Sequence, residues 1–273
     1  MTTSPTCYFN GQMLPYGEIS LHVSDLLIQR GYGIFDYFRA RNGAIPWLED
    51  YTDRVFNSMR LSEIDTEMTR EQFTTIIHEL QQQNGFDNGA FKVIVTGGYS
   101  DTLESVTGAP NFLILNVPWN RPPATTYQEG VTLARYKFVR PNPEIKTLNY
   151  FNTMRLRKRM TTYNAIDVLF HTDTISEASR ANVFFVQKGR VSTPADNILY
   201  GVTRKKVLSL FPDIRVEDVM IDWLEEFDEI FIASTSRDIT PVIAVEGLRI
   251  GNGTPGPFTR EVQAAFRDRG WME

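Results

Sequence analysis

Hydrophobic and polar positions along the first 120 residues follow two periods, one typical of strands and one typical of helices. Two short strand-like runs flank the Asn10–Gly11 pair, a dipeptide typical of hairpin turns. Apolar residues then recur at helical spacing over 47–64 and again over 69–85, where Thr69 offers an N-cap and Gly85 a stop. With further strands predicted over 31–40, 91–98 and 111–117, this half is expected to pack helices against a mostly antiparallel sheet.

The second half follows a change in composition. Residues 118–130 hold three prolines and few apolar residues, so 119–130 is predicted to be a linker. The pattern beyond it predicts strands over 131–139, 165–172, 181–189, 190–194 and 228–235, and helices over 148–164, 201–211 and 257–270. The sequence therefore predicts an α+β chain of two domains, one over 1–118 and one over 131–273.

Charge and cysteine content narrow the class of partner. The 273-residue chain carries a formal net charge of −5, which argues against nucleic acid or an anionic membrane surface as the main partner. A single cysteine, Cys7, excludes an internal disulfide and a multi-cysteine metal site. The first residues lack the profile of a signal peptide, and no apolar run is long enough to cross a bilayer. We therefore expect a cytoplasmic protein.

Common catalytic motifs are missing from the sequence. The three histidines, His22, His78 and His171, are never at metal-ligand spacing, so no metal site is expected. The P-loop, nucleophile-elbow and dinucleotide-binding patterns are also missing. Lysine is scarce, and Lys146 lies in a proline-flanked loop beside Ile145, where partly apolar surroundings favour the neutral amine that a nucleophile needs. A solvated surface lysine is the alternative.

Other segments concentrate groups that suit a phosphate or a charged ring. Thr203 opens a predicted helix, where free N–H groups and a hydroxyl favour an anion. Three hydroxyl residues, 234–236, follow a predicted strand, and the planar fork of Arg54 suits phosphate oxygens. Glu177 stands just before an apolar strand. Taken singly, each has an ordinary alternative as a cap, a turn or a solvated helix face.

Seven segments follow one another along the chain in the order RGYGIFDYFRARNG, LEDYTDRVFNSMRL, EIKTLNY, SEASRANVF, LYGVTRKKV, STSRDITPV and GNGTPGPFT. Together they resemble the pyridoxal-phosphate-dependent class IV aminotransferases (fold type IV). That family includes branched-chain aminotransferases, D-amino acid aminotransferases and aminodeoxychorismate lyases. The resemblance implies a small N-terminal α/β domain, a larger C-terminal domain with a barrel-like sheet, the cofactor between them, and a homodimer.

The resemblance also implies a role for each matching residue. Lys146 is expected to bind the cofactor through its amine and to move the proton at the substrate α-carbon. Glu177 is expected to pair with the pyridine nitrogen, so that the ring serves as an electron sink. Leu199 resembles the residue packed on the ring face, and Tyr150 the tyrosine near the ring hydroxyl. The implied cofactor-binding set is Arg54, Lys146, Tyr150, Glu177, Leu199, Val202, Thr203, Ser234 and Thr235.

The residues expected on the substrate side point in more than one direction. By the resemblance, Gly97 stands at a position where D-amino acid aminotransferases and related lyases keep an arginine, which counts against both types. Phe35 and Arg39 resemble the branched-chain segment, whereas Tyr37 stands where those enzymes keep glycine. These three residues alternate along a predicted strand and are expected to share one face, with plain packing as the alternative. Substrate contacts are expected from Phe35, Tyr37, Arg39, Thr235 and Ser236.

The sequence thus predicts an aminotransferase of branched-chain type that moves an amino group between an amino acid and a 2-oxo acid by a ping-pong mechanism. Three alternatives stay open. The first is a lyase that eliminates pyruvate from aminodeoxychorismate, because the same lysine and glutamate serve both reactions. The second is a D-amino acid aminotransferase, and the third a non-catalytic relic that binds a phosphate or cofactor.

Overall fold

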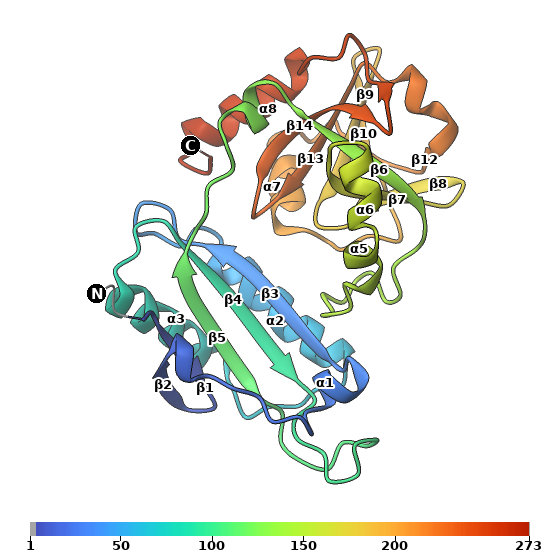
Figure 1. Cartoon of the computed structure of the whole chain (residues 1–273). Helices are drawn as coiled ribbons and strands as arrows, with labels where there is room; N and C mark the ends of the chain where they lie inside the picture. Colours follow the sequence, from blue (N-terminus) through green and yellow to red (C-terminus); the bar gives the residue numbers. More distant parts are fainter. Residues whose placement is uncertain (1–3, 273) are drawn as a thin grey trace. The chain divides into compact units, whose positions relative to one another are not determined.

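A computed structural model describes residues 4–272 and divides the chain into two units (Figure 1). The first unit runs up to Asn120 and also holds Ile145–Asn149. The second holds Arg121–Glu144 and the chain from Tyr150 onward. A two-domain division with a boundary near residue 120 is expected from the sequence, but the return of Ile145–Asn149 to the first unit is not.

The first unit is an antiparallel sheet with two long helices on one face (Figure 1). Its strand order is β2-β1-β5-β4-β3, with every pairing antiparallel as expected. Its strands are β1 (Thr6–Phe9), β2 (Gln12–Pro15), β3 (Gly33–Arg39), β4 (Gly89–Thr96) and β5 (Phe112–Pro118), and its helices are α1 (Leu26–Arg30), α2 (Leu48–Leu61), α3 (Arg70–Asn84) and the 3-10 turn η1 (Tyr16–Glu18).

Alternation along β3 decides which side chains reach the helices. Phe38 is fully buried and stacks on Tyr51 of α2 at 5.2 Å between ring centroids. Phe35, Tyr37 and Arg39 therefore point to the opposite face of the sheet. Helix α3 begins with a capping box at Thr69 and ends at a left-handed Gly85, as the sequence predicts.

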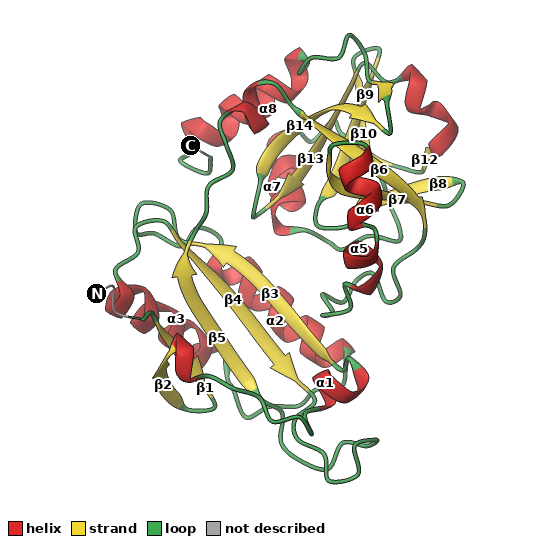
Figure 2. Cartoon of the chain, in the orientation of Figure 1, coloured by secondary structure: helices red, strands yellow, loops and turns green. Residues whose placement is uncertain are grey.

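The second unit is built around a ten-stranded curled sheet, coloured yellow in Figure 2. The strand order is β11-β10-β9-β13-β14-β6-β7-β8-β12, with β15 paired to β14. Its strands are β6 (Val131–Lys137), β7 (Ala165–His171), β8 (Thr174–Ala178), β9 (Asn182–Gln187), β10 (Arg190–Thr193), β11 (Arg215–Val216), β12 (Val219–Met220), β13 (Glu229–Ser234), β14 (Asp238–Val245) and β15 (Leu248–Arg249). Its helices are α4 (Thr125–Gln128), α5 (Phe151–Arg155), α6 (Arg157–Thr162), α7 (Val202–Leu210), α8 (Pro257–Asp268) and the 3-10 helix η2 (Ile221–Glu226).

A tight turn between β8 and β9 requires this sheet to curl. The two strands stand far apart in the strand order, yet Ala178 and Ala181 form a two-residue antiparallel bridge with hydrogen bonds in both directions. The interior is filled by a buried apolar cluster that includes Leu133, Val183 and Phe185. Curling lets one sheet bury this cluster against itself.

The second unit departs from the predicted elements at several places. The predicted helix 148–164 begins only at Phe151 and is broken into α5 and α6, and the predicted linker 119–130 contains the short helix α4, whose Tyr127 is buried. No element was predicted where β8, β11, β12, η2, β14 and β15 lie. Strand β8 is short and polar, and β14 contains Pro241, so neither has the usual pattern of a strand. Among residues 4–272, no helix is long and apolar enough to span a membrane.

Glu229 is expected to stabilise the second unit by capping α8. Its buried carboxylate accepts hydrogen bonds from the backbone N–H groups of Phe258 and Thr259 and from the Thr259 hydroxyl. Glu229→Ala leaves those donors unpaired, so the free energy of unfolding should fall by about 2 kcal/mol. Urea unfolding followed by circular dichroism measures this loss. Glu261→Ala, on the exposed side of the same helix, is the control, and an equal effect from both would contradict the capping role.

Candidate active site

Lys146 is held beside the edge of the first unit's sheet. β3 is an edge strand, and the segment after Ile145 pairs with it as a short additional strand. The Phe35 N–H donates to the Lys146 carbonyl at 2.9 Å, and the Leu148 N–H donates to the Gly33 carbonyl at 3.1 Å. These two bonds flank Thr147 and fix the backbone directly after Lys146. On the other side of the Lys146 side chain, its N–H donates to the Ser58 hydroxyl oxygen at 3.5 Å.

An aromatic ring lies directly under the Lys146 amine. The amine nitrogen is 4.5 Å from the centroid of the Phe35 ring. The Lys92 amine, from the neighbouring strand β4, lies 5.5 Å from the same centroid, and burial lowers the pKa of Lys92. The face of the sheet opposite the helices therefore gathers two amines around one apolar side chain.

Arg54 is fixed by a buried carboxylate of β3. Its Nε and Nη2 donate to the two oxygens of Asp36 at 2.8 and 2.6 Å, a bidentate pair. Asp36 is almost fully buried, so the pair locks the guanidinium in one orientation. Sequence reasoning missed Asp36. The signal that would have found it is a carboxylate between apolar residues of the strand that precedes the helix of Arg54.

Two further predicted substrate residues lie on the Phe35 face of β3. Tyr37 is partly buried, and Arg39 is 2% exposed. The Arg39 guanidinium carbon lies 3.7 Å from the centroid of the Trp119 ring. Arg39 therefore stacks on the aromatic side chain that follows β5.

Glu177 is the centre of a hydrogen-bonded group in the second unit. Its Oε1 accepts from Arg140, with Nε at 3.0 Å and Nη2 at 2.9 Å, and its Oε2 accepts from the Leu199 N–H at 2.9 Å. The Leu199 carbonyl in turn accepts from Asn182 Nδ2 at 2.7 Å. Leu199 is thus held at both of its backbone polar atoms by residues from β8 and β9.

Arg140 is the residue of this group that sequence reasoning missed. It is the first residue of the proline-containing loop 140–147, in which the sequence indicated Lys146 as the candidate. Tyr150, at the start of α5, lies in the same electrostatic environment. Burial raises the pKa of Tyr150 to about 12, opposed by the positive charge of Arg140 and reinforced by Asp167 and Glu177. Its phenol is therefore neutral at physiological pH.

The start of α7 presents a buried hydroxyl to an open helix end. Val202 and Thr203 are the first two helical residues, and the N-cap, Gly201, supplies no side-chain cap. Thr203 is 3% exposed, and its Oγ1 has no hydrogen-bond partner among the residues that the structure describes. Gly201 is required here because a Cβ would lie 2.1 Å from Asn182 Oδ1. An unpartnered hydroxyl beside free helix N–H groups suits an anion.

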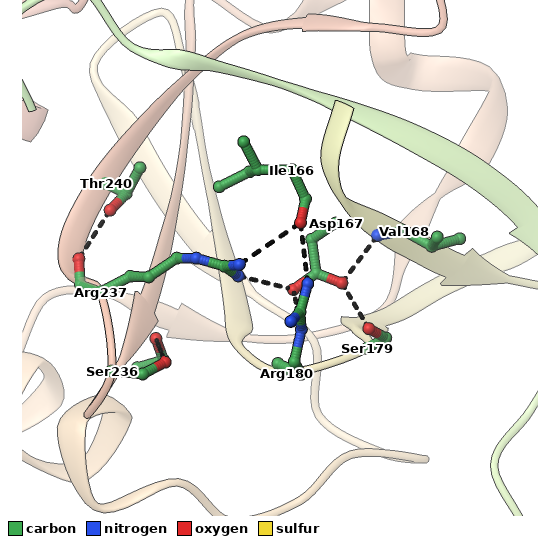
Figure 3. Close-up of polar contacts among 9 residues, drawn as sticks. Ile166, Asp167, Val168, Ser179, Arg180, Ser236, Arg237 and Thr240 are labelled. Atoms are coloured by element: carbon green, nitrogen blue, oxygen red, sulfur yellow. Dashed lines mark hydrogen bonds and ion pairs between the residues drawn. The ribbon is translucent and has the colours of Figure 1, made fainter. Parts of the chain in front are cut away.

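The hydroxyl residues 234–236 occupy the tight turn between β13 and β14. Ser234 ends β13 and is paired with Asp238, so three residues, 235–237, connect the strands. Asp238 adopts a left-handed conformation at φ 50°, which lets the turn close. The Ser234 and Ser236 hydroxyls are 3.5 Å apart. Arg237, the third residue of the turn, extends toward β7 (Figure 3).

The predicted site residues fall into two groups, one in each unit. Lys146, Arg54, Phe35, Tyr37 and Arg39 belong to the first unit, and Tyr150, Glu177, Leu199, Val202, Thr203, Ser234, Thr235 and Ser236 belong to the second. Within residues 4–272, no group of three or more His, Cys, Asp or Glu side chains is arranged to hold a metal ion.

Comparison with known proteins decides the family. Residues 33–245 match the family model of the class IV amino-transferases. This chain is a class IV aminotransferase. The family resemblance predicted from the sequence is thereby confirmed, and so is the assignment as an enzyme that acts on small molecules.

Relatives of this aminotransferase divide between two substrate types. A D-alanine aminotransferase from Staphylococcus haemolyticus is 27% identical over 270 residues, covering 95% of each chain. A provisionally named branched-chain-amino-acid aminotransferase from Methanocaldococcus jannaschii is 28% identical over 277 residues, covering 96% of this chain and 95% of its own. The T.th. branched-chain amino acid aminotransferase, solved with pyridoxamine 5′-phosphate, has a TM-score of 0.89 at 20% identity, covering 99% of this chain and 95% of its own. The mixed α/β fold predicted from the sequence is therefore confirmed.

Thr203→Val tests whether the Thr203 hydroxyl serves the protein or a ligand. Because the buried hydroxyl has no partner in the described chain, replacing it with a methyl should leave the free energy of unfolding of the ligand-free protein unchanged or raise it by up to about 1 kcal/mol. Thr193→Val is the control, since that buried hydroxyl donates to the Val183 carbonyl at 2.8 Å. This control should lose about 1 kcal/mol. A comparable loss for Thr203→Val would show that the hydroxyl has a structural partner.

Proposed function

We propose that this class IV aminotransferase transfers an amino group between a branched-chain amino acid and a 2-oxo acid, with pyridoxal 5′-phosphate as cofactor. The observation that carries the substrate type is at Gly97. A Cβ there would lie 2.3 Å from Cδ1 of Tyr32 and 3.2 Å from Cβ of Leu26. The position at which the D-amino acid enzymes are expected to keep arginine is thus filled by an aromatic ring, and no larger side chain fits without moving it.

The surroundings of Lys146 support an apolar substrate side chain. Phe35 lies under the amine, and Ile94 of β4 pairs with Phe35 across the strands on the same face. Phe35 and Ile94 offer no hydrogen-bond donor to a carboxylate-bearing side chain, so such a chain would lose water against them. The Lys92 amine, 5.5 Å from the Phe35 centroid, is a group of this face that could attract a carboxylate. An isobutyl or isopropyl group would instead bury apolar surface, worth about 25 cal/mol per Å².

The residues present fit a phosphorylated pyridine cofactor. The unpartnered Thr203 hydroxyl at the start of α7 is the observation that tests the fit, because a phosphate oxygen supplies the acceptor that the protein does not. The amides of Val202 and Thr203, the Thr235 segment and the preoriented Arg54 are the proposed phosphate contacts. Leu199 is proposed to pack on the ring, and Tyr150 to donate from its neutral phenol to the ring oxygen.

Each remaining group has a chemical task that its geometry supports. When bound, pyridoxal phosphate supplies the carbonyl group and the electron-accepting ring. Lys146 is proposed to bind the cofactor and to move the proton at the substrate α-carbon. Glu177 is proposed to keep the pyridine nitrogen protonated, and Arg140 to hold that carboxylate in place. Leu199 is kept at a fixed distance from Glu177 by its N–H.

D-alanine is the second candidate donor, favoured by the Staphylococcus haemolyticus relative. A direct comparison of donors separates the two types. With pyridoxal phosphate bound and 2-oxoglutarate as acceptor, L-leucine, L-isoleucine or L-valine should give a kcat/KM at least about tenfold above that of D-alanine, equivalent to about 1.4 kcal/mol. Release of the 2-oxo acid product and the change in visible absorbance measure the transfer. A preference for D-alanine would overturn the branched-chain assignment.

Lys146→Ala tests the role of the lysine in the same assay. The variant should lose transfer by several orders of magnitude while retaining phosphate-dependent binding of the cofactor. Lys158→Ala, on the exposed face of α6, should transfer at the normal rate. Unchanged transfer in Lys146→Ala would contradict the mechanism. Pyruvate released from aminodeoxychorismate without a 2-oxo acid acceptor would show a lyase instead.

A further inference from the structure

In the second unit, a buried carboxylate of β7 accepts hydrogen bonds from two guanidinium groups (Figure 3). Asp167 is fully buried, and its Oδ2 accepts from Arg237 Nη1 at 3.1 Å and from Arg180 Nε at 3.3 Å. Both arginines also donate to the same backbone carbonyl, that of Ile166, through Nη2 atoms at 3.4 and 2.8 Å. Two cations therefore converge on one anion and one neutral acceptor.

The charge of this cluster is not balanced. The other oxygen of Asp167 accepts from the Ser179 hydroxyl and, at 2.8 Å, from the Val168 N–H. Both of these partners are neutral, so Asp167 supplies one negative charge to two guanidinium groups. The described contacts of each arginine use two of its five N–H donors. The Arg237 side chain is 19% exposed and that of Arg180 is 38% exposed. A net positive charge with spare donors thus lies within reach of a ligand.

The two arginines stand next to residues already proposed for the active site. Arg237 is the third residue of the β13–β14 turn, directly after Thr235 and Ser236, and Thr240 Oγ1 donates to its carbonyl at 2.6 Å. Arg180 follows Glu177 by three residues, in the turn that closes β8 on β9. The described ion pairs of both arginines are those with Asp167. One carboxylate therefore holds together two segments that carry separate parts of the proposed site.

We propose that Arg237, aimed by Asp167 and assisted by Arg180, binds the α-carboxylate shared by the amino acid and 2-oxo acid substrates. This inference rests on the proposed transamination. A substrate carboxylate supplies the second anion that neutralises the cluster, and an arginine fork matches its two oxygens. Because the chain has a glycine and no arginine at position 97, Arg237 and Arg180 supply the positive charge for the α-carboxylate, which every amino acid and 2-oxo acid substrate carries.

Burial strengthens the attraction at this point. Burial lowers the pKa of Arg237, and the opposing negative charge of Asp167 raises it. Partial removal of water reduces screening, so a carboxylate here gains more than it would on an exposed surface. The Thr235–Ser236 amides are proposed to share the same carboxylate, which leaves the substrate side chain free to meet other groups.

The test compares a carboxylate with its uncharged isostere on the protein loaded with pyridoxal phosphate. Binding of 4-methylvalerate and of 4-methylvaleramide is followed by the visible absorbance of the bound cofactor. The unaltered protein should prefer the acid, and Arg237→Gln should reduce that preference at least about tenfold, equivalent to about 1.4 kcal/mol. Arg190→Gln, an exposed arginine on β10, is the control and should keep the full preference. An undiminished preference in Arg237→Gln would overturn the proposal.

A second variant keeps the test valid if the first fails to fold. Arg237→Gln leaves Asp167 with one cation, whereas the double variant Asp167→Asn with Arg237→Gln removes opposite charges together and retains hydrogen-bonding groups. It should fold, bind the cofactor and show the same loss of acid preference. Arg237→Lys should recover part of it, because the charge returns without the planar fork. A folded double variant with the full preference would overturn the proposal, as would a lysine variant no better than glutamine.

The result is independent of the substrate type assigned above. Neither 4-methylvalerate nor its amide has an amino group, so the binding measurement needs no turnover. A preference for D-alanine in the donor assay would remove the branched-chain assignment. The acid–amide comparison would then be made with propionate and propionamide, which have the side chain of alanine. Conversely, normal leucine transfer by Arg237→Gln with an unchanged KM would remove the carboxylate role and leave the aminotransferase assignment intact.

Discussion

The pairing of the Lys146 segment with the edge of β3 is the constraint on which the proposed site depends. Chain from the second unit precedes this segment and follows it, yet Ile145–Asn149 is part of the first unit. The Phe35 N–H and the Gly33 carbonyl would face solvent on a bare edge strand. Here they are hydrogen-bonded to the Lys146 segment, which takes the place of a sixth strand. A lysine in a mobile loop would sample many orientations, whereas here the backbone that follows Lys146 is bonded to β3, and its amine lies over the Phe35 ring.

Three buried carboxylates, those of Asp36, Glu177 and Asp167, supply the second layer of order, and an arginine offsets the cost of burying each of them. Asp36 forms an ion pair with Arg54, and Glu177 forms one with Arg140, so in each described pair one positive charge faces one negative charge. Asp167 differs, because two guanidiniums share it. A balanced pair orients a side chain for work elsewhere, whereas an unbalanced cluster retains an attraction for an anion. This contrast separates positioning from binding in the second unit.

The sequence was most informative where periodicity and capping agreed. Helix α3, with Thr69 and Gly85 at its ends, follows directly from local chemistry. Strand β8 and Arg140 did not, because their placement depends on partners remote in the chain: β8 pairs with β7 and β12, and Arg140 is recognisable only when Glu177 lies beside it. Local composition made Lys146 and Thr203 candidates, and the family resemblance predicted their roles. Neither the pairing with the β3 edge nor the missing partner of the Thr203 hydroxyl is visible in the sequence.

Substrate choice depends on where the chain has a cation that can bind the substrate carboxylate and where other side chains fill that space. At Gly97 the ring of Tyr32 occupies the space a longer side chain needs, so recognition of the substrate carboxylate is displaced from the first unit's sheet to another part of the chain. The β13–β14 turn and the β8–β9 turn meet that requirement together, since Asp167 gathers one arginine from each. With the carboxylate proposed to bind there, the apolar surface of Phe35 and Ile94 is left to contact the substrate side chain. A division of the two tasks would account for the aromatic ring beside the Lys146 amine and for the two arginines, one from each turn, that share Asp167.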